Sequence, residues 1–465
     1  MGYGSLSDLL NDVRSCLQLT GGAVKVTDAA QLRSTVIDRL VYAAAFGSDE
    51  VKDAARWIIW QAAWEVGVQP ASIDSLYQAR QRGEYSGATV PAVNVRAMAW
   101  DVSRALVRAA HAKKVGPFIF ELAKSEMGYT HQKPDEYATV VTAASIKEGH
   151  QGPIFIQGDH FQASAKNYGK DPEAEIEGLR KLIREAVAAG FYNIDIDTST
   201  LVDLSFPTLD EQQRTNYERC AELAKLVRDL EPAGVTISTG GEIGEVGKKN
   251  STPDELNAYA DGFDRVFAEL TGGARGLSKI SVQTGTSHGG VVLPDGSIAQ
   301  VKLDFETLRE LSSVARTKGM GGAVQHGAST LPAEAFDKFP QMDCLEVHLA
   351  TEFQNILFDG GAFPEDLKQD IYKYLREACA DEAVEGETDE QFIYKTRKKA
   401  WGPFKQQTWD LPTSTRGQMG ELIQDKFEFL MDKLGASNTE HLTESHIKPV
   451  RVDKPIPEAL RAAIS

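Results

Sequence analysis

Eight short β-type segments alternate with amphipathic segments of helical length over the central part of the chain. The β-type segments lie at residues 90–95, 117–123, 153–160, 192–199, 235–245, 279–289, 321–329 and 344–353. Strict β–α alternation indicates a parallel sheet, because each connection must return the chain to the same edge before the next strand begins. Eight such units predict an α/β fold closed into a (β/α)8 TIM barrel. An open doubly wound sheet is the competing fold, but no GxGxxG turn follows the first strand.

Two further segments flank the predicted barrel. Residues 1–88 carry apolar residues at helical spacing, which predicts an added N-terminal helical segment. The stretch QARQRGEYSGATVP then interrupts this pattern with Gly, Ser and Pro. We therefore expect an N-terminal helical segment at 1–88, the barrel with a C-terminal helical extension at 89–435, and a Pro-rich tail at 436–465 that wraps the surface.

Composition excludes several classes of protein. The 465 residues accommodate one barrel of about 250 residues with extra helices. No run of about 18 apolar residues and no signal-peptide pattern appears, so we expect neither a membrane span nor secretion. Four widely spaced cysteines form no CxxC pair, which indicates a reducing cytoplasmic compartment. The net charge of -17 argues against a nucleic-acid partner. An anionic substrate would need local positive potential from a metal and backbone N–H groups.

Three of the nine histidines share one setting at the ends of predicted strands. His160 ends FIQGDHF, His288 ends SVQTGTSHGG, and His326 ends AVQHGAS. Barrel enzymes place their chemistry at the carboxyl ends of strands, and catalytic zinc has three protein ligands and one open position. A lone histidine is often a hydrogen-bonded core residue, but three at matching strand ends predict a metal site. Zn²⁺ is the expected ion, with Mn²⁺, Co²⁺ and Fe²⁺ as alternatives.

A carboxylate directly precedes the first of these histidines. Asp159 near a metal can move a proton at a substrate carbon or hydroxyl, but it can equally orient a histidine ligand. Its position alone does not separate these roles. Neighbouring residues within a strand point to opposite sides, but the chain turns at a strand end, so Asp159 and His160 can point either to the same side or to opposite sides. The His-Gly steps at Gly289 and Gly327 allow close approach of backbone, and their N–H groups can hold a phosphate.

The segments GDH, TSHGG and HGAS resemble the class II fructose-bisphosphate and tagatose-bisphosphate aldolases. The resemblance extends from about Val90 to Thr351, with a weaker similarity near Lys398–Phe404, and it depends on the order and spacing of these motifs along eight strands. It implies that Asp159 transfers a proton and that the three histidines bind the metal. It also implies further roles. Substrate or phosphate contacts are implied for Asn94, Gly289, Gly327 and Ser329, an extra or alternative metal ligand for Glu242, and a supporting role for Asp197.

The sequence departs from the family pattern at two places. HLATEF resembles the last strand of the tagatose type, in which Asn, Thr and Glu occur, but His348 stands where the Asn is expected. We expect His348 and Thr351 to contact the substrate. Lys248 and Lys249 stand where the family has Gly and Glu in a mobile loop, which leaves the loop proton donor in doubt. These lysines either bind a second anionic group or belong to a solvated basic loop.

The resemblance implies a reversible, metal-dependent aldol cleavage. Its first candidate substrate is fructose 1,6-bisphosphate, split into dihydroxyacetone phosphate and an aldehyde, with no lysine Schiff base. It also implies a homo-oligomer, either a dimer or a tetramer. FELAKSEMGYTHQKPDEY resembles the non-catalytic companion subunits of tagatose-bisphosphate aldolases. A companion or regulatory subunit is therefore one alternative. The others are an aldolase for another phosphorylated ketose and a different metal-dependent hydrolase or isomerase.

Overall fold

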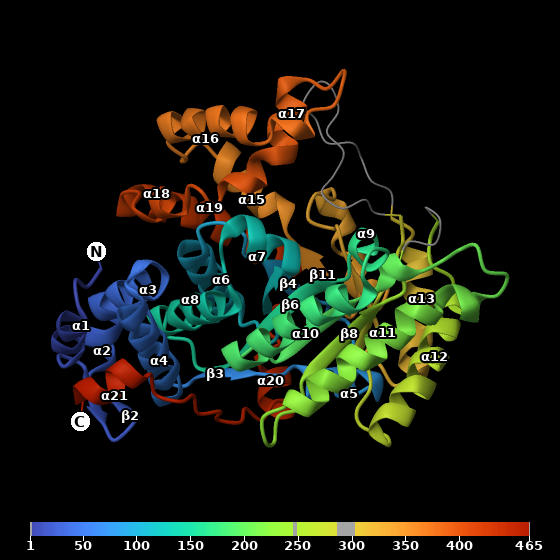
Figure 1. The fold of residues 1–465 in the computed structure, drawn as a ribbon, viewed down its shortest axis with the longest axis horizontal. Helices are drawn as coiled ribbons and strands as arrows, with labels where there is room; N and C mark the ends of the chain where they lie inside the picture. The colour runs from blue at the N-terminus through green and yellow to red at the C-terminus, as the bar shows by residue number, and fades with distance from the viewer. Residues whose placement is uncertain (1, 245–248, 286–302, 465) are drawn as a thin grey trace.

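Eight parallel strands form a closed barrel in the computed structural model, which describes residues 2–244, 249–285 and 303–464 (Figure 1). The strands are β4 (Val90–Asn94), β5 (Ile119–Ala123), β6 (Gly152–Gln162), β7 (Asn193–Asp197), β8 (Ser238–Glu242), β9 (Lys279–Ser281), β10 (Ala323–Gln325) and β11 (Glu346–Leu349). Each pairs in parallel with the next, and β11 pairs with β4 to close the sheet. Each observed strand overlaps one predicted segment, so the predicted (β/α)8 barrel is confirmed.

The long helices around the barrel match the amphipathic segments of the sequence. They are α6 (Ala99–Lys113), α8 (Pro134–Lys147), α10 (Pro172–Ala189), α11 (Leu209–Leu230), α12 (Pro253–Thr271) and α13 (Phe305–Thr317), with the shorter α7 (Lys124–Thr130), α9 (Ala165–Tyr168) and η2 (Ser199–Leu201) between them. Capping residues determine where helices begin, as α10 illustrates. The Asp171 side chain accepts the Ala174 N–H and Pro172 occupies the first turn, which satisfies the free N–H groups of α10. The strands pack their apolar outer faces against these helices, so the core surrounds the barrel.

The N-terminal segment is mainly helical, as expected for residues 1–88, and it also contains short strands. It contains α1 (Leu6–Val13), α2 (Ala29–Gln31), η1 (Leu32–Val36), α3 (Ile37–Phe46), α4 (Asp49–Glu65) and α5 (Asp74–Gln81), but also a hairpin of β1 (Leu17–Thr20) and β2 (Ala23–Val26). Gly21 and Gly22 both adopt positive φ, the conformation that a two-residue hairpin turn requires. A ninth parallel strand, β3 (Val68–Ala71), pairs with β6 outside the barrel. Strands of four residues are too short for periodicity to distinguish from helix.

The first helices of the C-terminal extension lie over the carboxyl ends of the strands, where α16 and α17 stand above the barrel (Figure 1). Its elements are α15 (Thr351–Asp359), α16 (Glu365–Ala378), η4 (Ala380–Glu382), α17 (Asp389–Thr396), η5 (Arg397–Ala400), α18 (Lys405–Trp409), α19 (Thr413–Lys433), α20 (Glu440–His446) and α21 (Glu458–Ile464). The short η3 (Ala333–Ala335) and α14 (Lys338–Gln341) connect β10 to β11 within the barrel. The final residues return to α4, where the indole N–H groups of Trp57 and Trp60 donate to the carbonyls of Lys454 and Val452. Among the described residues, no helix is long and apolar enough to cross a membrane.

Candidate active site

A β-bulge at the end of β6 brings two consecutive residues to one site. Two β6 residues, Asp159 and His160, stand opposite the single Asp195 of β7 in the register, and His160 adopts a φ of 40°. Positive φ is uncommon for a residue other than glycine and persists where the surroundings impose it. The Oδ1 atom of Asp159 consequently lies 3.8 Å from Nε2 of His160. The side chains of Asp159 and His160 therefore point into the same site. Their positions in the sequence alone did not decide this.

Glycine is required just before this bulge. A Cβ atom on Gly158 would lie 2.4 Å from the ring of Phe161, closer than packed carbon atoms approach. The Phe161 ring is fully buried, so it has little room to move away. Gly158 thus lets β6 turn tightly where Asp159 and His160 enter the site.

Three side chains from three strands form a candidate metal site. The ligand atoms of His160, Glu242 and His326 all lie within 4.8 Å of one another. Oε2 of Glu242 is 3.2 Å from Nδ1 of His160 and 3.9 Å from Nδ1 of His326. Two imidazoles and a carboxylate suit a divalent transition metal. The predicted ligand His288 and the neighbouring Gly289 lie outside the described residues.

The electrostatics of this group fit a cation. Burial, and then the nearby charge of Asp197, raise the pKa of Glu242 to about 7. Asp197 accepts hydrogen bonds from Nδ1 of His160 at 3.0 Å and from Nε2 of Gln162 at 2.6 Å. Although burial raises the pKa of Asp197, these contacts hold it below its ordinary value. A bound cation would offset the crowding of buried negative charge, so the donor set and its surroundings both favour a metal.

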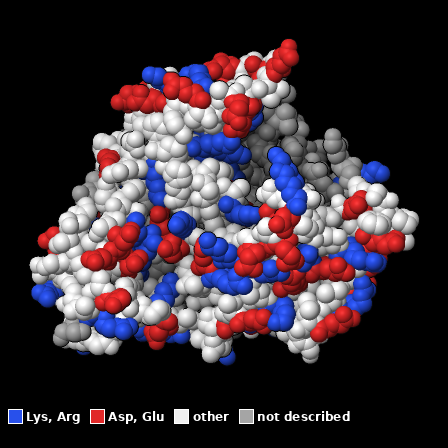
Figure 2. Space-filling view, viewed as in Figure 1, with Lys and Arg blue, Asp and Glu red and all other residues white. Residues whose placement is uncertain are grey.

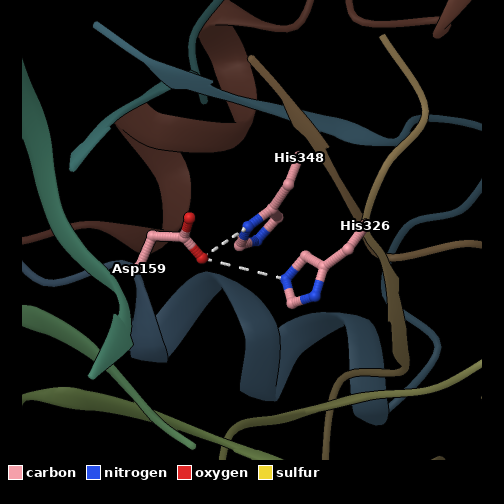
Figure 3. Close-up of side chains that lie close together, drawn as sticks. All are labelled: Asp159, His326 and His348. Carbon is pink, nitrogen blue, oxygen red and sulfur yellow. Dashed lines mark hydrogen bonds and ion pairs between the residues drawn. The ribbon is translucent and has the colours of Figure 1, made fainter. Parts of the chain in front are cut away.

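Two histidines face one oxygen of the Asp159 carboxylate (Figure 3), and Asn94 contacts the other. Oδ1 lies 3.1 Å from Nδ1 of His348 and 3.9 Å from Nε2 of His326, and Oδ2 accepts from Nδ2 of Asn94 at 2.8 Å. Burial alone would raise the pKa of Asp159, but His160 and His348 hold it well below its ordinary range. Asp159 is therefore a buried, ionised carboxylate beside the candidate metal site.

His348 lies between carboxylates. Its Nε2 is 2.6 Å from Oε1 of Glu346, and its Nδ1 is 3.2 Å from Oε1 of Glu121 as well as near Asp159. Burial lowers the pKa of an imidazolium, but Glu121 and Asp159 raise that of His348 well above its ordinary value. Both ring nitrogens of His348 face carboxylates, and the ligand atoms of Asp159, His326 and His348 all lie within 4.8 Å of one another, so these three residues are a second candidate metal group.

A polar network fills the barrel beneath this site. Nζ of Lys279 lies 2.5 Å from Oε1 of Glu346 and 2.9 Å from Oδ2 of Asp195, and it donates to Oε1 of Gln157 at 2.7 Å. Lys279 is on β9, and its partners are on β6, β7 and β11, none of which is adjacent to β9, so these side chains meet inside the barrel. Burial lowers the pKa of Lys279, but Asp195 and Glu346 raise it above its ordinary value. A lysine kept protonated in this way is a poor nucleophile.

A cavity of about 1180 Å³ opens above these residues. The strand ends contribute residues predicted from the sequence to bind metal or substrate, namely Asn94, Asp159, His160, His326, Gly327, Ser329, His348 and Thr351. Gly327 has a φ of 66°, which favours glycine, and the Ser329 hydroxyl accepts the Thr351 N–H at 3.1 Å. Lys249 is exposed and is not among the described residues that line the cavity. Lys248 lies outside the residues that the structure describes.

Sequence reasoning missed three residues of this cavity. Glu126, at the start of α7, accepts from Nδ2 of Asn94 at 2.9 Å and pairs with Arg96. Arg96 follows β4 by two residues and contacts Thr351, with Nη1 3.4 Å from Oγ1. Lys398 comes from η5 of the C-terminal extension. The closeness of Arg96 and Glu126 to strand ends was an available signal. The weaker family similarity near Lys398–Phe404 marked the segment of Lys398 but gave it no role.

Comparisons with known proteins identify a family and several similar folds. The family model for class II fructose-bisphosphate aldolase matches residues 74–396. No curated protein matches the sequence significantly. Similar solved structures include a fructuronate-tagaturonate epimerase from Cohnella laeviribosi (12% identity, TM-score 0.54, covering 92% of this chain and 90% of that one). Others are a probable tagatose 6 phosphate kinase from Sinorhizobium meliloti 1021 (17%, 0.50, 81% and 98%) and a fructose-bisphosphate aldolase from Campylobacter jejuni (17%, 0.47, 80% and 96%).

At these identities the solved structures show the fold alone. The family model covers more than half of the chain, and its range includes all eight barrel strands and the candidate metal site. The chain belongs to the class II fructose-bisphosphate aldolase family.

Proposed function

We propose that this protein is a metal-dependent lyase that cleaves a phosphorylated ketose in a reversible retro-aldol reaction. Fructose 1,6-bisphosphate is the first substrate to test. The observation that carries the proposal is the position of the ionised Asp159 beside the group His160, Glu242 and His326, at the carboxyl ends of the barrel strands. Barrel enzymes assemble their chemistry at this face from the ends of different strands.

His160, Glu242 and His326 would hold the metal, with His288 as a further predicted ligand. Zn²⁺ is the first expectation, and Mn²⁺, Co²⁺ or Fe²⁺ suit the same donors. When bound, the metal supplies a Lewis acid that polarises the oxygens of the ketose. The neighbouring Asp197 orients the His160 ring through its hydrogen bond to Nδ1.

Asp159 takes the proton that cleavage releases. Breaking the carbon–carbon bond requires loss of a proton from the hydroxyl on the aldehyde-forming carbon, while the bonding electrons stay with the ketose-derived half. The Asp159 carboxylate is ionised before the reaction, so it has a vacant position for that proton. Asn94 and His348 hold its two oxygens, so the carboxylate does not need to reorient during the reaction.

The substrate phosphate would bind at the ends of the late strands. The left-handed backbone at Gly327 and the hydroxyl of Ser329 line the cavity there, and Gly289 is a predicted third contributor. Thr351 begins α15, and its N–H donates to the Ser329 hydroxyl, which places that hydroxyl at the N-terminus of a helix, where an anion is favoured. This side of the cavity suits a phosphate.

A second candidate is epimerisation of a ketouronate. The same bond cleavage, followed by rotation of the released aldehyde and re-formation of the bond, inverts one hydroxyl-bearing carbon. The fold similarity to the fructuronate-tagaturonate epimerase spans 92% of this chain, and Arg96 and Lys398 in the cavity suit a carboxylate. A ketouronate has no phosphate, so the two candidates predict different uses of Ser329.

The deciding experiment uses the purified full chain with its metal content measured. We expect cleavage of fructose 1,6-bisphosphate that stops with a chelator, returns with Zn²⁺, and is lost in Asp159→Asn but kept in the surface variant Lys249→Ala. Interconversion of fructuronate and tagaturonate, followed by NMR, without bisphosphate cleavage would support the epimerase instead. A protein that binds no metal and turns over neither substrate class would contradict both and support a companion subunit.

A further inference from the structure

The side-chain amide of Asn94 is held between two carboxylates. Its Nδ2 atom donates to Oε2 of Glu126 at 2.9 Å and to Oδ2 of Asp159 at 2.8 Å. An ionised carboxylate only accepts hydrogen bonds, and an amide nitrogen carries two N–H groups, so both donors of Asn94 are used. The amide oxygen Oδ1 cannot face either carboxylate. Glu126 and Asp159 together therefore determine which way round the buried Asn94 amide lies.

Glu126 is itself fixed by donors on both of its oxygens. Its Oε1 accepts from Nε of Arg96, and its Oε2 also accepts the backbone N–H of Ala123 at 2.9 Å. The side chain is buried in the first turn of α7, directly after β5. Every one of these partners is a donor, so the Glu126 carboxylate cannot exchange roles with the amide of Asn94. The start of α7 thus carries the group that orients Asn94.

The Asn94 oxygen is left for a ligand. Among the described residues, Oδ1 of Asn94 has no hydrogen-bond partner, and Asn94 lines the cavity above the strand ends. An amide oxygen accepts hydrogen bonds from O–H and N–H groups, whereas a fully ionised phosphate or carboxylate has no hydrogen to donate. This point of the cavity therefore suits a hydroxyl group of the substrate.

The neighbouring Asp159 indicates which hydroxyl this is. In the proposed reaction Asp159 takes the proton of the hydroxyl on the aldehyde-forming carbon, and the metal polarises the oxygens of the ketose-derived half. Two histidines face Oδ1 of Asp159, whereas Asn94 adjoins its other oxygen (Figure 3). The hydroxyl one carbon further along the aldehyde-derived half consequently remains for the Asn94 oxygen.

We propose that Glu126 is a positioning residue that sets substrate specificity through Asn94, by holding the amide so that its oxygen accepts the hydroxyl next to the aldehyde-forming carbon. The inference rests on the proposed function and deepens it to a substrate class, namely ketoses with a free hydroxyl at that carbon. In fructose 1,6-bisphosphate it is the 5-hydroxyl. Glutamine at position 126 would place an N–H group opposite either Nε of Arg96 or Nδ2 of Asn94. The positive charge of Arg96 favours an oxygen on its own side, so the Asn94 amide would have to turn over.

Changing Glu126 also releases Arg96 from its ion pair. Arg96 is one of the positive side chains that line the cavity, and Lys and Arg side chains gather around the hollow between the barrel and the helices α15–α17 (Figure 2). A released guanidinium acts on phosphate groups, whereas the Asn94 oxygen acts on one hydroxyl. A bisphosphate and its 5-deoxy analogue carry the same phosphates, so the preference between them isolates the contribution of Asn94.

The experiment measures binding by calorimetry in the zinc-loaded Asp159→Asn protein, in which asparagine keeps an acceptor for Asn94. The ligands are fructose 1,6-bisphosphate and 5-deoxyfructose 1,6-bisphosphate. The analogue cannot close a furanose ring, but this property of the free ligand is the same for every variant and cancels between them. Glu126→Gln, Asn94→Ala and the double variant are compared with Glu175→Gln, and thermal unfolding confirms that each is folded. Glu175 is the matched control because it is a carboxylate paired at 3.0 Å with another cavity cation, Lys124.

We expect Glu126→Gln and Asn94→Ala each to lower the preference for the ligand with the 5-hydroxyl by about 3–10-fold, the value of one hydrogen bond. The double variant should lose no more than Asn94→Ala alone, because Glu126 acts through Asn94. Glu175→Gln should keep the original preference. Equal weakening of both ligands by Glu126→Gln, or additive losses in the double variant, would overturn the role of Glu126.

Cleavage by the wild type separates this inference from the proposed function. A wild type that cleaves the bisphosphate, with no selective loss in Glu126→Gln, would reject the role of Glu126 and keep the lyase. A selective loss in a protein whose wild type cleaves nothing would keep the role of Glu126 and reject the lyase. A zinc-loaded protein that binds neither ligand would overturn both.

Discussion

The ring of His348 bridges Asp159 and Glu346, with Nδ1 3.1 Å from Oδ1 of Asp159 and Nε2 2.6 Å from Oε1 of Glu346. Glu346 in turn holds Lys279 in the barrel interior. The candidate catalytic carboxylate is thus connected through one imidazole to a buried ion network. This bridge fixes the carboxylate and keeps it charged, which explains how a residue on a strained bulge stays in place.

Replacing Asp159 by Asn should stop the chemistry without emptying the site. Asparagine keeps the shape and the contact to Asn94 but cannot accept the proton, so we expect kcat to fall by about 10²–10⁴-fold. Metal content and KM should change little, because the candidate ligands remain. Steady-state kinetics with metal analysis on the same sample checks this. Retention of more than a tenth of the wild-type kcat would remove Asp159 from the proton-transfer role.

Replacing His348 by Asn tests the bridge. An amide cannot reach both carboxylates and carries no charge, so Glu346 and Asp159 lose a shared cation. We expect kcat to fall while KM stays near its original value, and the free energy of unfolding to fall by about 1–3 kcal/mol. Kinetics and urea unfolding measure the two effects. His441→Asn, at an exposed histidine far along the chain, is the matched control and should change neither.

Removing the metal should lower stability as well as activity. A ligand that binds only the folded state stabilises it by about 4 kcal/mol at a thousand times its dissociation constant. We expect a chelator to lower Tm, and Glu242→Gln to reduce the bound metal measured by elemental analysis. An unchanged Tm together with an absence of metal in the untreated protein would argue against the metal site.

Gly158→Ala should disrupt the bulge. The new Cβ would lie 2.4 Å from the Phe161 ring, and overpacking of this kind costs about 1–3 kcal/mol. Because Asp159 and His160 follow directly, we also expect a loss of activity and of metal. The control is Gly178→Ala on the exposed face of α10, where a Cβ meets nothing within 4 Å and alanine favours the helix. The control should be as stable as the wild type or more so.

Acid should destabilise the protein partly through His150. Its ring is buried, stacks on His111 and has Nδ1 3.3 Å from Nε2 of that residue. Burial lowers the pKa of His150 from 6.5 to about 4. The unfolded chain takes up this proton first, so the stabilising contribution is present above pH 6.5 and is lost as the pH falls toward 4.

The magnitude of this effect follows from the pKa difference, at about 3 kcal/mol for the full shift. Urea unfolding of wild type and His150→Gln between pH 4 and pH 7 measures it. The variant should show a shallower fall in stability with acid, while the exposed His441→Gln keeps the wild-type slope. Parallel curves for His150→Gln and wild type would assign the acid sensitivity to other groups.

Local pattern in the sequence was enough to predict the barrel. Helical periodicity in segments such as α10 and α11, and short apolar runs such as β4, report which residues are buried within one element, and their alternation determines the topology. The same logic placed Asp159, His160 and His326 at strand ends, and closure of the sheet brings strand ends together. It failed for β1, β2 and β3, which are too short to show a period.

Only the tertiary structure decided the partners of these residues. The contacts of His348 with Asp159 and Glu121, the pairing of Lys279 with Asp195, and the placing of Lys398 over the cavity join positions far apart in the chain. Charged side chains inside a barrel interrupt the apolar pattern and look like surface residues until closure of the sheet buries them together. The sequence thus determined the fold and the strand ends that carry the chemistry. The closed barrel and its C-terminal extension determined which charges meet there. Charged side chains are tolerated in the interior only when they are paired, and no local sequence pattern predicts which residues form the pairs.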